Sequence, residues 1–481
     1  MWKRAMNVVA SSVATAALAG CGSLRLDEAL AVAPNMVSHQ LCSAVFVAGL
    51  DPASYYREYI APNLSVLEPL VHYRLDHRRK EVTANFAGIF RSRAVYRGAE
   101  GCLVVQGPVK APAAAPPVAA DSLLPPLAGP DVVTPTDPAL LAALEHEFAN
   151  PGPEGPRSTK AVVIVHNGHI IAERYAPGYG VETPMLGWSM TKSVLNALVG
   201  ILVREGKLSI TGPAPVSAWA DPADPHHPIN IDNFLRMNSG LKFGQSLTQN
   251  WKTAFDPTAQ MVFAKPDMAA VAERAPVEAP PGAVWRYSNG NTMLLSRIVR
   301  DAVGGDAASV LRFVHTELFD KLGMVRPTLE FDAVGTPLAA THMWAPPRDW
   351  ARLGLLYLND GFIGGVRILP KGWVDYSARL TPGSEDVGYG AGFWTNRGDQ
   401  KGAALGRPHM PRDSFMAQGS LGQYVIVIPS AQLVIVRLGI SRTPGEDMAG
   451  MDKLTEETMA ALGIGGRSRA RVAGKKAAID N

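Results

Sequence analysis

Residues 186–202 read LGWSMTKSVLNALVGIL, and this stretch decides how the rest of the chain is interpreted. It places Ser189 directly before a long apolar run and Lys192 three residues further on. Residues three apart share one face of a helix, so the two side chains meet if the helix begins near Ser189. A lysine is rarely buried without a partner or a task. Because burial favours the neutral amine, Lys192 is predicted to take the proton of Ser189 and make it a nucleophile.

The Ser-x-x-Lys pattern is unspecific on its own, since the chain contains a second copy from Ser239 to Lys242. Gly240 interrupts that copy near a turn, and no apolar helix follows it. The alternative interpretation of the first copy is a structural serine at a helix N-terminus, with the lysine reaching the surface. The apolar run after Lys192 favours the catalytic interpretation.

A second group of residues is Tyr287-Ser288-Asn289, in the stretch PGAVWRYSNGNTMLLSRIV. A tyrosine beside a lysine can have a lowered pKa and pass a proton to a leaving group. Asn289 can orient the lysine or bind the amide groups of a substrate. The similar Tyr357-Leu358-Asn359 ends an apolar segment, where we expect the tyrosine to pack in the core.

These motifs, with their flanks and in this order, resemble those of the class C β-lactamase-like serine hydrolases. The resemblance is greatest to the branch of penicillin-binding-type esterases and 6-aminohexanoate-dimer hydrolases, and it covers residues from about 140 to 462. It implies an α+β fold of the β-lactamase/transpeptidase type, with an antiparallel sheet flanked by helices and a helical subdomain. It also implies that Ser189 is the nucleophile, Lys192 its base and Tyr287 the partner acid or base, with Asn289 in support.

The family's third motif is a triplet with lysine or histidine that ends in glycine, and the matching stretch here is Ala417-Gln418-Gly419. The cation is missing, which disfavours β-lactam and peptidoglycan substrates because both carry a carboxylate. The resemblance implies that Gly419 lines the site and that the N–H groups of Ser189 and Ser420 form an oxyanion hole. His342 precedes a segment that borders the cleft in the resembled branch, so it is a candidate for contact with substrate. The alternative is a loop histidine whose hydrogen bonds are satisfied within the protein.

The function expected from these residues is hydrolysis of carboxylic esters or small linear amides through an acyl-serine intermediate. One alternative is a DD-peptidase or β-lactamase acting on cell-wall or penicillin-like amides. Another is a non-catalytic envelope protein that binds peptides or wall fragments with the same fold. No metal or cofactor is expected, because the His226-His227 pair has no cysteine or carboxylate at metal-ligand spacing.

The N-terminus reads MWKRAMNVVASSVATAALAGCGS, which is typical of a secretory signal peptide. Its end, LAGC, resembles a bacterial lipoprotein signal and implies cleavage after residue 20 and lipidation of Cys21. The alternative is an ordinary signal peptide with an incidental cysteine. We expect export to the periplasmic side and a lipid anchor in the outer membrane, since Gly22 does not favour retention in the inner membrane.

Five segments are predicted along the 481 residues. After the signal peptide, a small domain of strands spans residues 21–106, with a disulfide between Cys42 and Cys102. The predicted segments that follow are a Pro/Ala-rich spacer at 107–138, the hydrolase domain at 139–463 and a disordered basic tail at 464–481. The net charge of +3 comes from the two ends of the chain, which argues against a nucleic-acid partner.

Overall fold

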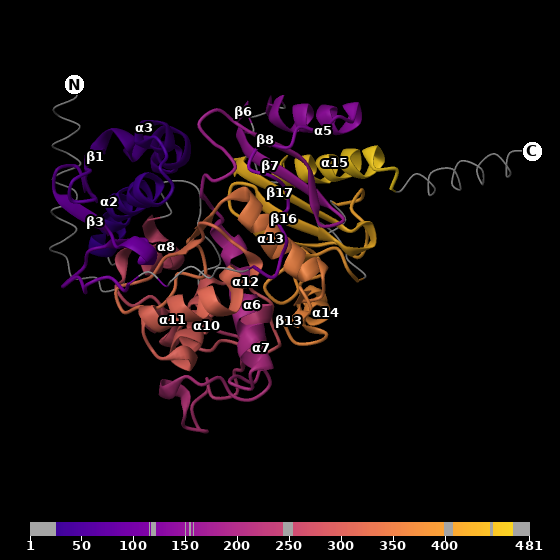
Figure 1. Cartoon of the computed structure of the whole chain (residues 1–481). Coiled ribbons are helices and arrows are strands. Elements are labelled where there is room, and N and C mark those ends of the chain that lie inside the picture. Colours follow the sequence, from indigo (N-terminus) through magenta and orange to yellow (C-terminus); the bar gives the residue numbers. More distant parts are fainter. Residues whose placement is uncertain are drawn as a thin grey trace, which may run out of the picture.

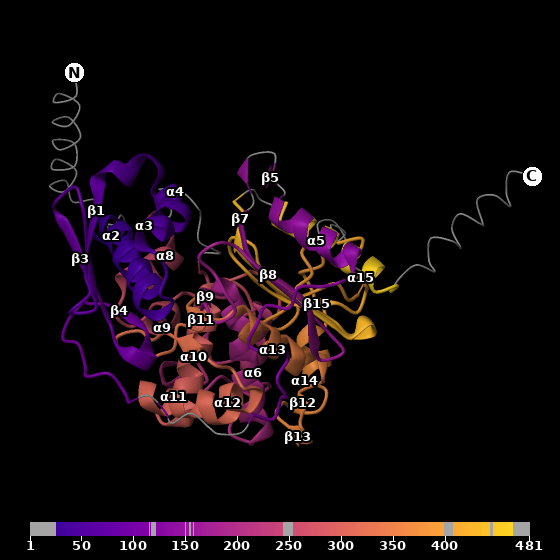
Figure 2. The ribbon, with the colours of Figure 1, turned by 45° about the horizontal axis from the view of Figure 1, so that its top comes forward.

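The computed structural model describes residues 26–114, 116, 122–149, 151–152, 155–156, 158–243, 254–398, 407–442 and 446–464. A small N-terminal domain packs beside a larger α+β domain (Figures 1 and 2). One apolar cluster includes buried side chains of both domains, so the two share a core. The predicted signal peptide, Cys21 and the chain after residue 464 lie outside the described residues.

The N-terminal domain consists of a long helix packed on a four-stranded antiparallel sheet of order β1-β2-β3-β4. Cys42 at the end of the helix and Cys102 in β4 form the disulfide that the sequence predicts. The elements are α2 (Leu26–Cys42), η1 (Ser43–Val47), α3 (Pro52–Tyr55), η2 (Tyr56–Ile60), α4 (Ala61–Leu64), η3 (Ser65–Leu70), β1 (Val71–Asp76), β2 (Glu81–Phe86), β3 (Phe90–Tyr96), η4 (Gly98–Glu100) and β4 (Cys102–Val104).

The sequence analysis predicted the strands of this domain but not its helix. The helix escaped notice because it is apolar on most sides and contains Pro34. It packs against the sheet on one side and α8 (Pro257–Ala264) of the larger domain on another, so a polar face is not needed. Among the described residues, Glu28–Val47 is the one helix long and apolar enough to cross a membrane, but 72 % of its apolar window is buried in protein.

Residues 122–133 of the predicted spacer are packed on the larger domain, whereas most of residues 107–114 are exposed. Leu124 and Leu127 are buried, and the Leu127 carbonyl accepts a hydrogen bond from the Ile170 N–H. Arg348 donates to the carbonyls of Gly129 and Asp131. The Pro/Ala composition does not reveal this packing, because it requires only two apolar side chains and a few backbone hydrogen bonds.

The larger domain is built on a six-stranded antiparallel sheet of order β14-β15-β16-β17-β7-β8. Asn167-Gly168 and Pro429-Ser430-Ala431 each lie between two apolar runs, a pattern that predicts hairpins, and both hairpins are present. The first turns at Asn167 and Gly168, which have φ of 50° and 81°. Pairing of β17 with β7 joins the two ends of the domain, which confirms the α+β fold. The strands are β7 (Ser158–His166), β8 (His169–Tyr175), β14 (Trp394–Thr395), β15 (Phe415–Gly419), β16 (Gln423–Ile428) and β17 (Leu433–Ile440).

Helices cover both faces of this sheet. α5 (Pro138–Ala149) and α15 (Glu446–Ala461) lie together on one face, and α6 (Thr191–Arg204) and α13 (Pro347–Leu358) lie on the other (Figures 1 and 2). Alternate residues of the strands point to the two sides and enter two different apolar clusters. α6 is a core helix, because all of its residues from Thr191 to Leu202 are buried.

A helical region lies beside the α6 face. Its helices and turns are η5 (Trp188–Met190), η6 (Ser217–Trp219), α7 (Ile231–Arg236), α8, α9 (Ala269–Glu273), α10 (Asn289–Val303), α11 (Ala307–Val314), η8 (His315–Phe319), α12 (Asp320–Leu322) and α14 (Trp373–Ala378). The turn η10 (Pro429–Ala431) instead joins β16 to β17. Short strands complete the domain: β5 (Pro151–Gly152), β6 (Gly155–Pro156), β9 (Met185–Leu186), β10 (Thr328–Leu329), β11 (Met343–Ala345), β12 (Phe362–Ile363) and β13 (Val366–Arg367).

Candidate active site

Ser189 lies on the short turn η5, which leads directly into the core helix α6. The chain before it is held on β11, because β9 pairs with that strand and the Gly187 N–H donates to Met343 over 2.9 Å. Gly187 has no room for a side chain, since an added Cβ would lie 2.3 Å from the ring of Trp350. Trp188 has φ of 48°, a conformation uncommon for a large residue. The turn is therefore tightly fixed, and it leaves Ser189 half-buried at the start of the helix.

The Lys192 ammonium is surrounded by uncharged hydrogen-bond acceptors. Its Nζ lies 3.1 Å from Ser189 Oγ, 2.6 Å from Asn289 Oδ1 and 2.7 Å from the Ala340 carbonyl oxygen. No ion pair to Lys192 occurs among the described residues. Burial lowers the pKa of Lys192 to about 7, because desolvation penalises the charged form. Near neutral pH, a large fraction of Lys192 is an amine that can accept the Ser189 proton.

Tyr287 lies on the other side of this pair, with its ring centroid 5.0 Å from Lys192 Nζ. Burial raises the pKa of Tyr287, and a hydrogen bond with Ser189 offsets this only in part. The lowered pKa expected from the sequence is therefore wrong. The physical reason is that a lysine half in its neutral form does little to stabilise a buried phenolate. Tyr287 is a protonated phenol at neutral pH, which suits it to donate a proton to a leaving group.

Asn289 is the first residue of α10 and is buried. Ser288 caps this helix, since its hydroxyl accepts a hydrogen bond from the Asn291 N–H. The cap fixes the backbone of Asn289 so that its Oδ1 accepts from Lys192. Of the two roles that the sequence left open for Asn289, the structure shows the contact needed to orient the lysine.

The end of strand β15 reaches the nucleophile turn. An added Cβ at Gly419 would lie 2.1 Å from the Gly187 carbonyl oxygen, so this close approach requires glycine. Ser420 follows in an exposed turn, before Leu421 with φ of 66°. The elements that carry the Ser189 and Ser420 N–H groups are thus neighbours. The oxyanion hole formed by these two groups stays a prediction.

The stretch that replaces the third motif carries no charge. Ala417 is buried in β15. The Gln418 amide donates to the Tyr424 hydroxyl on the adjacent strand, over 3.1 Å. A positively charged side chain is thus absent from the three positions 417–419, and a substrate carboxylate finds no ion-pair partner there.

His342 is not placed to touch substrate, which corrects the expectation from the sequence. Its side chain is 1 % exposed, and its ring centroid lies 4.8 Å from that of His39 in the N-terminal domain. Trp188 and Phe263 also pack against it. The sequence could not show this, because the contact partners come from distant parts of the chain.

The two similar motifs that the sequence analysis set aside lie apart from this arrangement. Ser239 donates to Asn291 Oδ1 and is buried, whereas Lys242 is exposed. Tyr357 is buried and donates to the Ser193 carbonyl and to Asn196 Oδ1. The second Ser-x-x-Lys and Tyr-x-Asn patterns are therefore structural.

Sequence reasoning missed three contributors to the site. The Ala340 carbonyl holds Lys192, and no residue type signals such a backbone contact. The rings of Tyr389 and Trp394 lie 5.8 and 5.6 Å from that of Tyr287 and form an aromatic wall. The aromatic residues within GYGAGFWT, at 388–395, are the signal that could have identified this wall.

The geometry combines a serine hydroxyl, a desolvated amine and a protonated phenol within a few ångströms. A hydroxyl with an adjacent base can attack a carbonyl carbon, and the phenol can protonate the group that leaves. The arrangement can therefore perform acyl transfer from an ester or amide to Ser189 and then to water.

Comparison with known proteins agrees with this chemistry. The sequence profile of the family described as Beta-lactamase matches residues 144–460, well over half of the chain. The 6-aminohexanoate-dimer hydrolase of Paenarthrobacter ureafaciens is 24 % identical over 310 residues, which cover 58 % of this chain and 72 % of that protein. Protein Rv1367c of Mycobacterium tuberculosis is 27 % identical over 259 residues, which cover 44 % of this chain and 63 % of that protein.

Solved structures share the fold. A penicillin-binding protein homolog from Caulobacter crescentus superposes with a TM-score of 0.53 at 15 % identity, covering 69 % of this chain and 100 % of that chain. EstCE1, described as a hydrolase with promiscuous acyltransferase activity, gives a TM-score of 0.50 at 16 % identity, covering 67 % of this chain and 98 % of that one. At these identities, the likeness concerns the fold alone.

Proposed function

The chain belongs to the Beta-lactamase family and is a serine hydrolase, and on that premise we propose that it hydrolyses carboxylic esters or small linear amides. The observation that carries this proposal is the 3.1 Å contact between Lys192 Nζ and Ser189 Oγ. Burial lowers the pKa of Lys192 to about 7, so this contact supplies a base at neutral pH.

Acylation begins when Ser189 Oγ attacks the substrate carbonyl carbon and its proton passes to Lys192 Nζ. The C–O bond to Ser189 forms, and the carbonyl oxygen becomes an anion that the N–H groups of Ser189 and Ser420 are proposed to hold. Collapse of this intermediate breaks the bond to the leaving group. Tyr287 gives its proton to that group and regains one from Lys192, so the proton balance closes.

Deacylation repeats these steps with water as the nucleophile. A water molecule attacks the acyl carbon, and Lys192 accepts its proton. The bond to Ser189 breaks, and Ser189 Oγ takes a proton back. The acid leaves and the starting state is restored, with every proton carried by Ser189, Lys192 and Tyr287.

Two features support esters or linear amides without a carboxylate beside the scissile bond. The stretch 417–419 is uncharged, so it offers no ion pair to such a carboxylate. The partly exposed ring of Trp394 beside Tyr287, backed by the buried ring of Tyr389, suits an apolar chain. The name of the Paenarthrobacter relative also places an enzyme for a small linear amide among the similar proteins.

We also propose export to the periplasmic side, with a lipid anchor at Cys21. The pattern LAGC supports the anchor. The disulfide between Cys42 and Cys102 supports export, because such bonds persist in oxidising compartments. Labelling with a radioactive fatty acid tests the anchor, and loss of label in Cys21→Ser is the expected result.

The function is tested by hydrolysis of a short-chain p-nitrophenyl ester by the parent and by Ser189→Ala. We expect the variant to lose at least about 10³-fold in kcat/KM while its circular dichroism stays that of the parent. Ser239→Ala, in the second Ser-x-x-Lys copy, is the matched control and keeps the activity.

Turnover by a folded Ser189→Ala equal to the parent would overturn the assignment of the nucleophile. If neither the parent nor Ser189→Ala hydrolyses the ester, a labelled fluorophosphonate distinguishes an amidase of narrow substrate specificity from a non-catalytic binding protein. The reagent labels Ser189 only when the serine is reactive. Stable labelling of Ser189 by a penicillin would instead favour a cell-wall or penicillin-like substrate.

A further inference from the structure

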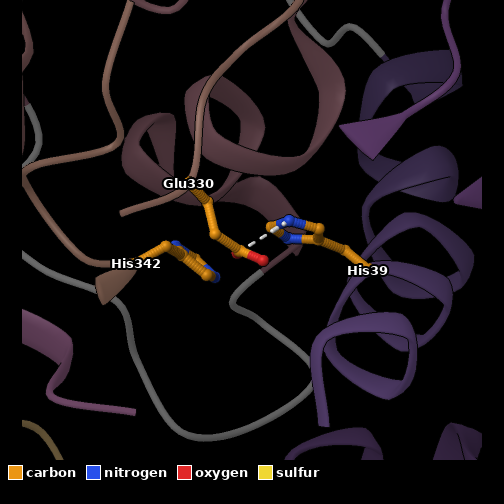
Figure 3. Close-up of side chains that lie close together, drawn as sticks. All are labelled: His39, Glu330 and His342. Carbon is orange, nitrogen blue, oxygen red and sulfur yellow. Dashed lines mark ion pairs between the residues drawn. The ribbon is translucent and has the colours of Figure 1, made fainter. Parts of the chain in front are cut away.

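A second buried polar cluster lies where the two domains meet. His39 comes from α2 of the N-terminal domain, and Glu330 and His342 are the first and last residues of the segment that joins β10 to β11. Their exposed fractions are 3, 0 and 1 %. Figure 3 shows the Glu330 carboxylate between the two rings, and one ligand atom from each residue lies within 4.8 Å of the others.

Two ring nitrogens of this cluster have no hydrogen bond. His39 Nδ1 and His342 Nε2 are buried and lack a hydrogen-bond partner, whereas Glu330 Oε2 lies 3.2 Å from His39 Nε2 in an ion pair. A buried polar group without a partner costs about 1–3 kcal/mol, so two in one place are unfavourable for the protein alone. A bound ligand that accepts lone pairs would remove this cost.

The remaining atoms of the cluster are held in orientation by hydrogen bonds. Ser43 Oγ and the Cys102 N–H donate to Glu330 Oε1 over 2.6 and 3.0 Å. His342 Nδ1 lies 2.7 Å from Thr341 Oγ1. When Nδ1 carries the proton of this bond, Nε2 presents its lone pair to the cluster. Such outer hydrogen bonds fix the carboxylate and the ring, as they do around metal ligands.

We propose that His39, Glu330 and His342 bind one divalent transition-metal ion, with Zn²⁺ as the best fit. Two imidazoles and one carboxylate form a ligand set that zinc takes with a fourth position left for another oxygen. Ca²⁺ and Mg²⁺ fit less well, because they require mostly oxygen ligands.

The distances require only a small adjustment. Ligand atoms of a tetrahedral zinc site lie about 3.3 Å apart, given bonds of about 2.0–2.1 Å. His39 Nε2 lies 3.2 Å from Glu330 Oε2 and 3.1 Å from the Cys102 carbonyl oxygen, so its ring proton must move to Nδ1 when the ion binds. The cluster as a whole lies within 4.8 Å, so inward shifts of the rings by roughly an ångström close the site.

The ion would act as a clamp between the domains and would not take part in the reaction. His39 belongs to the helix that ends at the disulfide, whereas His342 lies two residues after Ala340. The Ala340 carbonyl accepts a hydrogen bond from Lys192. The ion therefore fixes the segment that holds the lysine, from the side opposite to the site.

The test measures zinc binding by the purified full chain after treatment with a chelator. Zn²⁺ is added back in competition with a chromophoric chelator, and the thermal midpoint is recorded with and without the metal. The variants are His39→Gln and His342→Gln. His315→Gln is the matched control, because His315 pairs with Asp320 away from the cluster.

We expect the parent and His315→Gln to bind one Zn²⁺ per chain and to gain thermal stability from it. His39→Gln and His342→Gln should bind about 100-fold more weakly or worse, because changes to outer hydrogen bonds alone cost 10–100-fold. A parent that binds less than half an equivalent overturns the proposal and leaves a metal-free ion pair of His39 and Glu330. Unchanged affinity in His342→Gln overturns it as well.

A measurement on the parent alone keeps the proposal testable if the variants do not fold. The X-ray absorption spectrum of the zinc-loaded chain should show scattering from two imidazole rings. A spectrum without imidazole ligands would place the zinc elsewhere and refute the site.

Discussion

Two buried polar clusters both contact the segment 338–342, and burial has opposite effects on their ionisable groups. Around Lys192 the acceptors are uncharged, and burial lowers the pKa of the lysine to about 7. Around Glu330 the neighbours are histidines and hydrogen-bond donors, and they lower the pKa of the carboxyl although burial alone would raise it. In the first cluster the Lys192 amine is largely neutral near pH 7, whereas in the second the Glu330 carboxylate stays charged.

The difference shows what each cluster is suited for. A lysine that is held without an ion pair becomes a base, which is what a serine nucleophile needs. A carboxylate that is paired and accepts two hydrogen bonds stays fixed, which is what a junction between two domains needs. The same cost of burial thus gives reactivity in one place and rigidity in the other.

The largest effect on activity is expected when Lys192, whose amine is neutralised by burial, is replaced. Lys192→Met takes away the base, and kcat/KM on a p-nitrophenyl ester should fall by at least about 10³-fold at neutral pH. Lys242→Met, at the exposed lysine of the second motif, is the control and should match the parent. Burst amplitudes equal in Lys192→Met and the parent would show that Lys192 is not needed for acylation.

Breaking the charged cluster should instead reduce stability. Glu330→Ala leaves the donors of Ser43 and Cys102 without an acceptor, and we expect the free energy of unfolding to fall by about 3–5 kcal/mol. Glu317→Ala is the control, because its ion pairs with Arg204 and Lys321 are only partly buried and are worth about 1 kcal/mol or less. Denaturant unfolding measures both, and equal losses would contradict the role of Glu330 at the junction.

Tyr287→Phe separates proton donation from nucleophilic attack. An amine leaving group needs a proton, whereas p-nitrophenolate leaves without one. We therefore expect kcat on a linear amide to fall by about 10²-fold and on the p-nitrophenyl ester by much less. The ratio of the two losses is the measurement. Equal losses would mean that Tyr287 only shapes the site through its contacts with Tyr389 and Trp394.

The sequence predicted the parts of the fold and site that are local or carried by motifs. Ser189 and Lys192 meet because they are three residues apart at a helix start, and Asn167-Gly168 forms its hairpin because both residues tolerate positive φ. The order of the motifs led to the α+β family fold and to the contact between Lys192 and Asn289. These features depend on short stretches of sequence, so they can be read without the structure.

The remaining features depend on long-range packing. The helix α2 was missed because its partners, the sheet and α8, come from elsewhere in the chain. The cluster around Glu330 joins positions 39, 330 and 342, and no sequence spacing links them. The pKa of Tyr287 was expected in the wrong direction, because the extent of burial around the ring follows from the fold.

The two remaining predictions concern pH. Lys192 is a base only when neutral, so kcat/KM should rise with a midpoint near pH 7 and fall about tenfold per unit below it. Because burial raises the pKa of Tyr287, no loss from its ionisation is expected below pH 10, and the profile should reach a plateau. A bell-shaped profile that declines below pH 9, in a protein that stays folded, would contradict the assignment of a protonated Tyr287.

The free energy of unfolding should also change with pH, because the titration of Lys192 differs between the folded and unfolded chains. Its pKa is lowered on folding from the ordinary value of 10.5, so the folded chain binds fewer protons than the unfolded chain between pH 7 and that value. The lysine therefore costs most stability below pH 7, and this cost declines by up to about 1.4 kcal/mol per pH unit as pH rises. The unfolding free energies of the parent and Lys192→Met, measured at several pH values, should converge accordingly toward pH 10. A difference that does not vary with pH would mean that Lys192 stays charged in the fold, and the contrast between the two clusters would then fail.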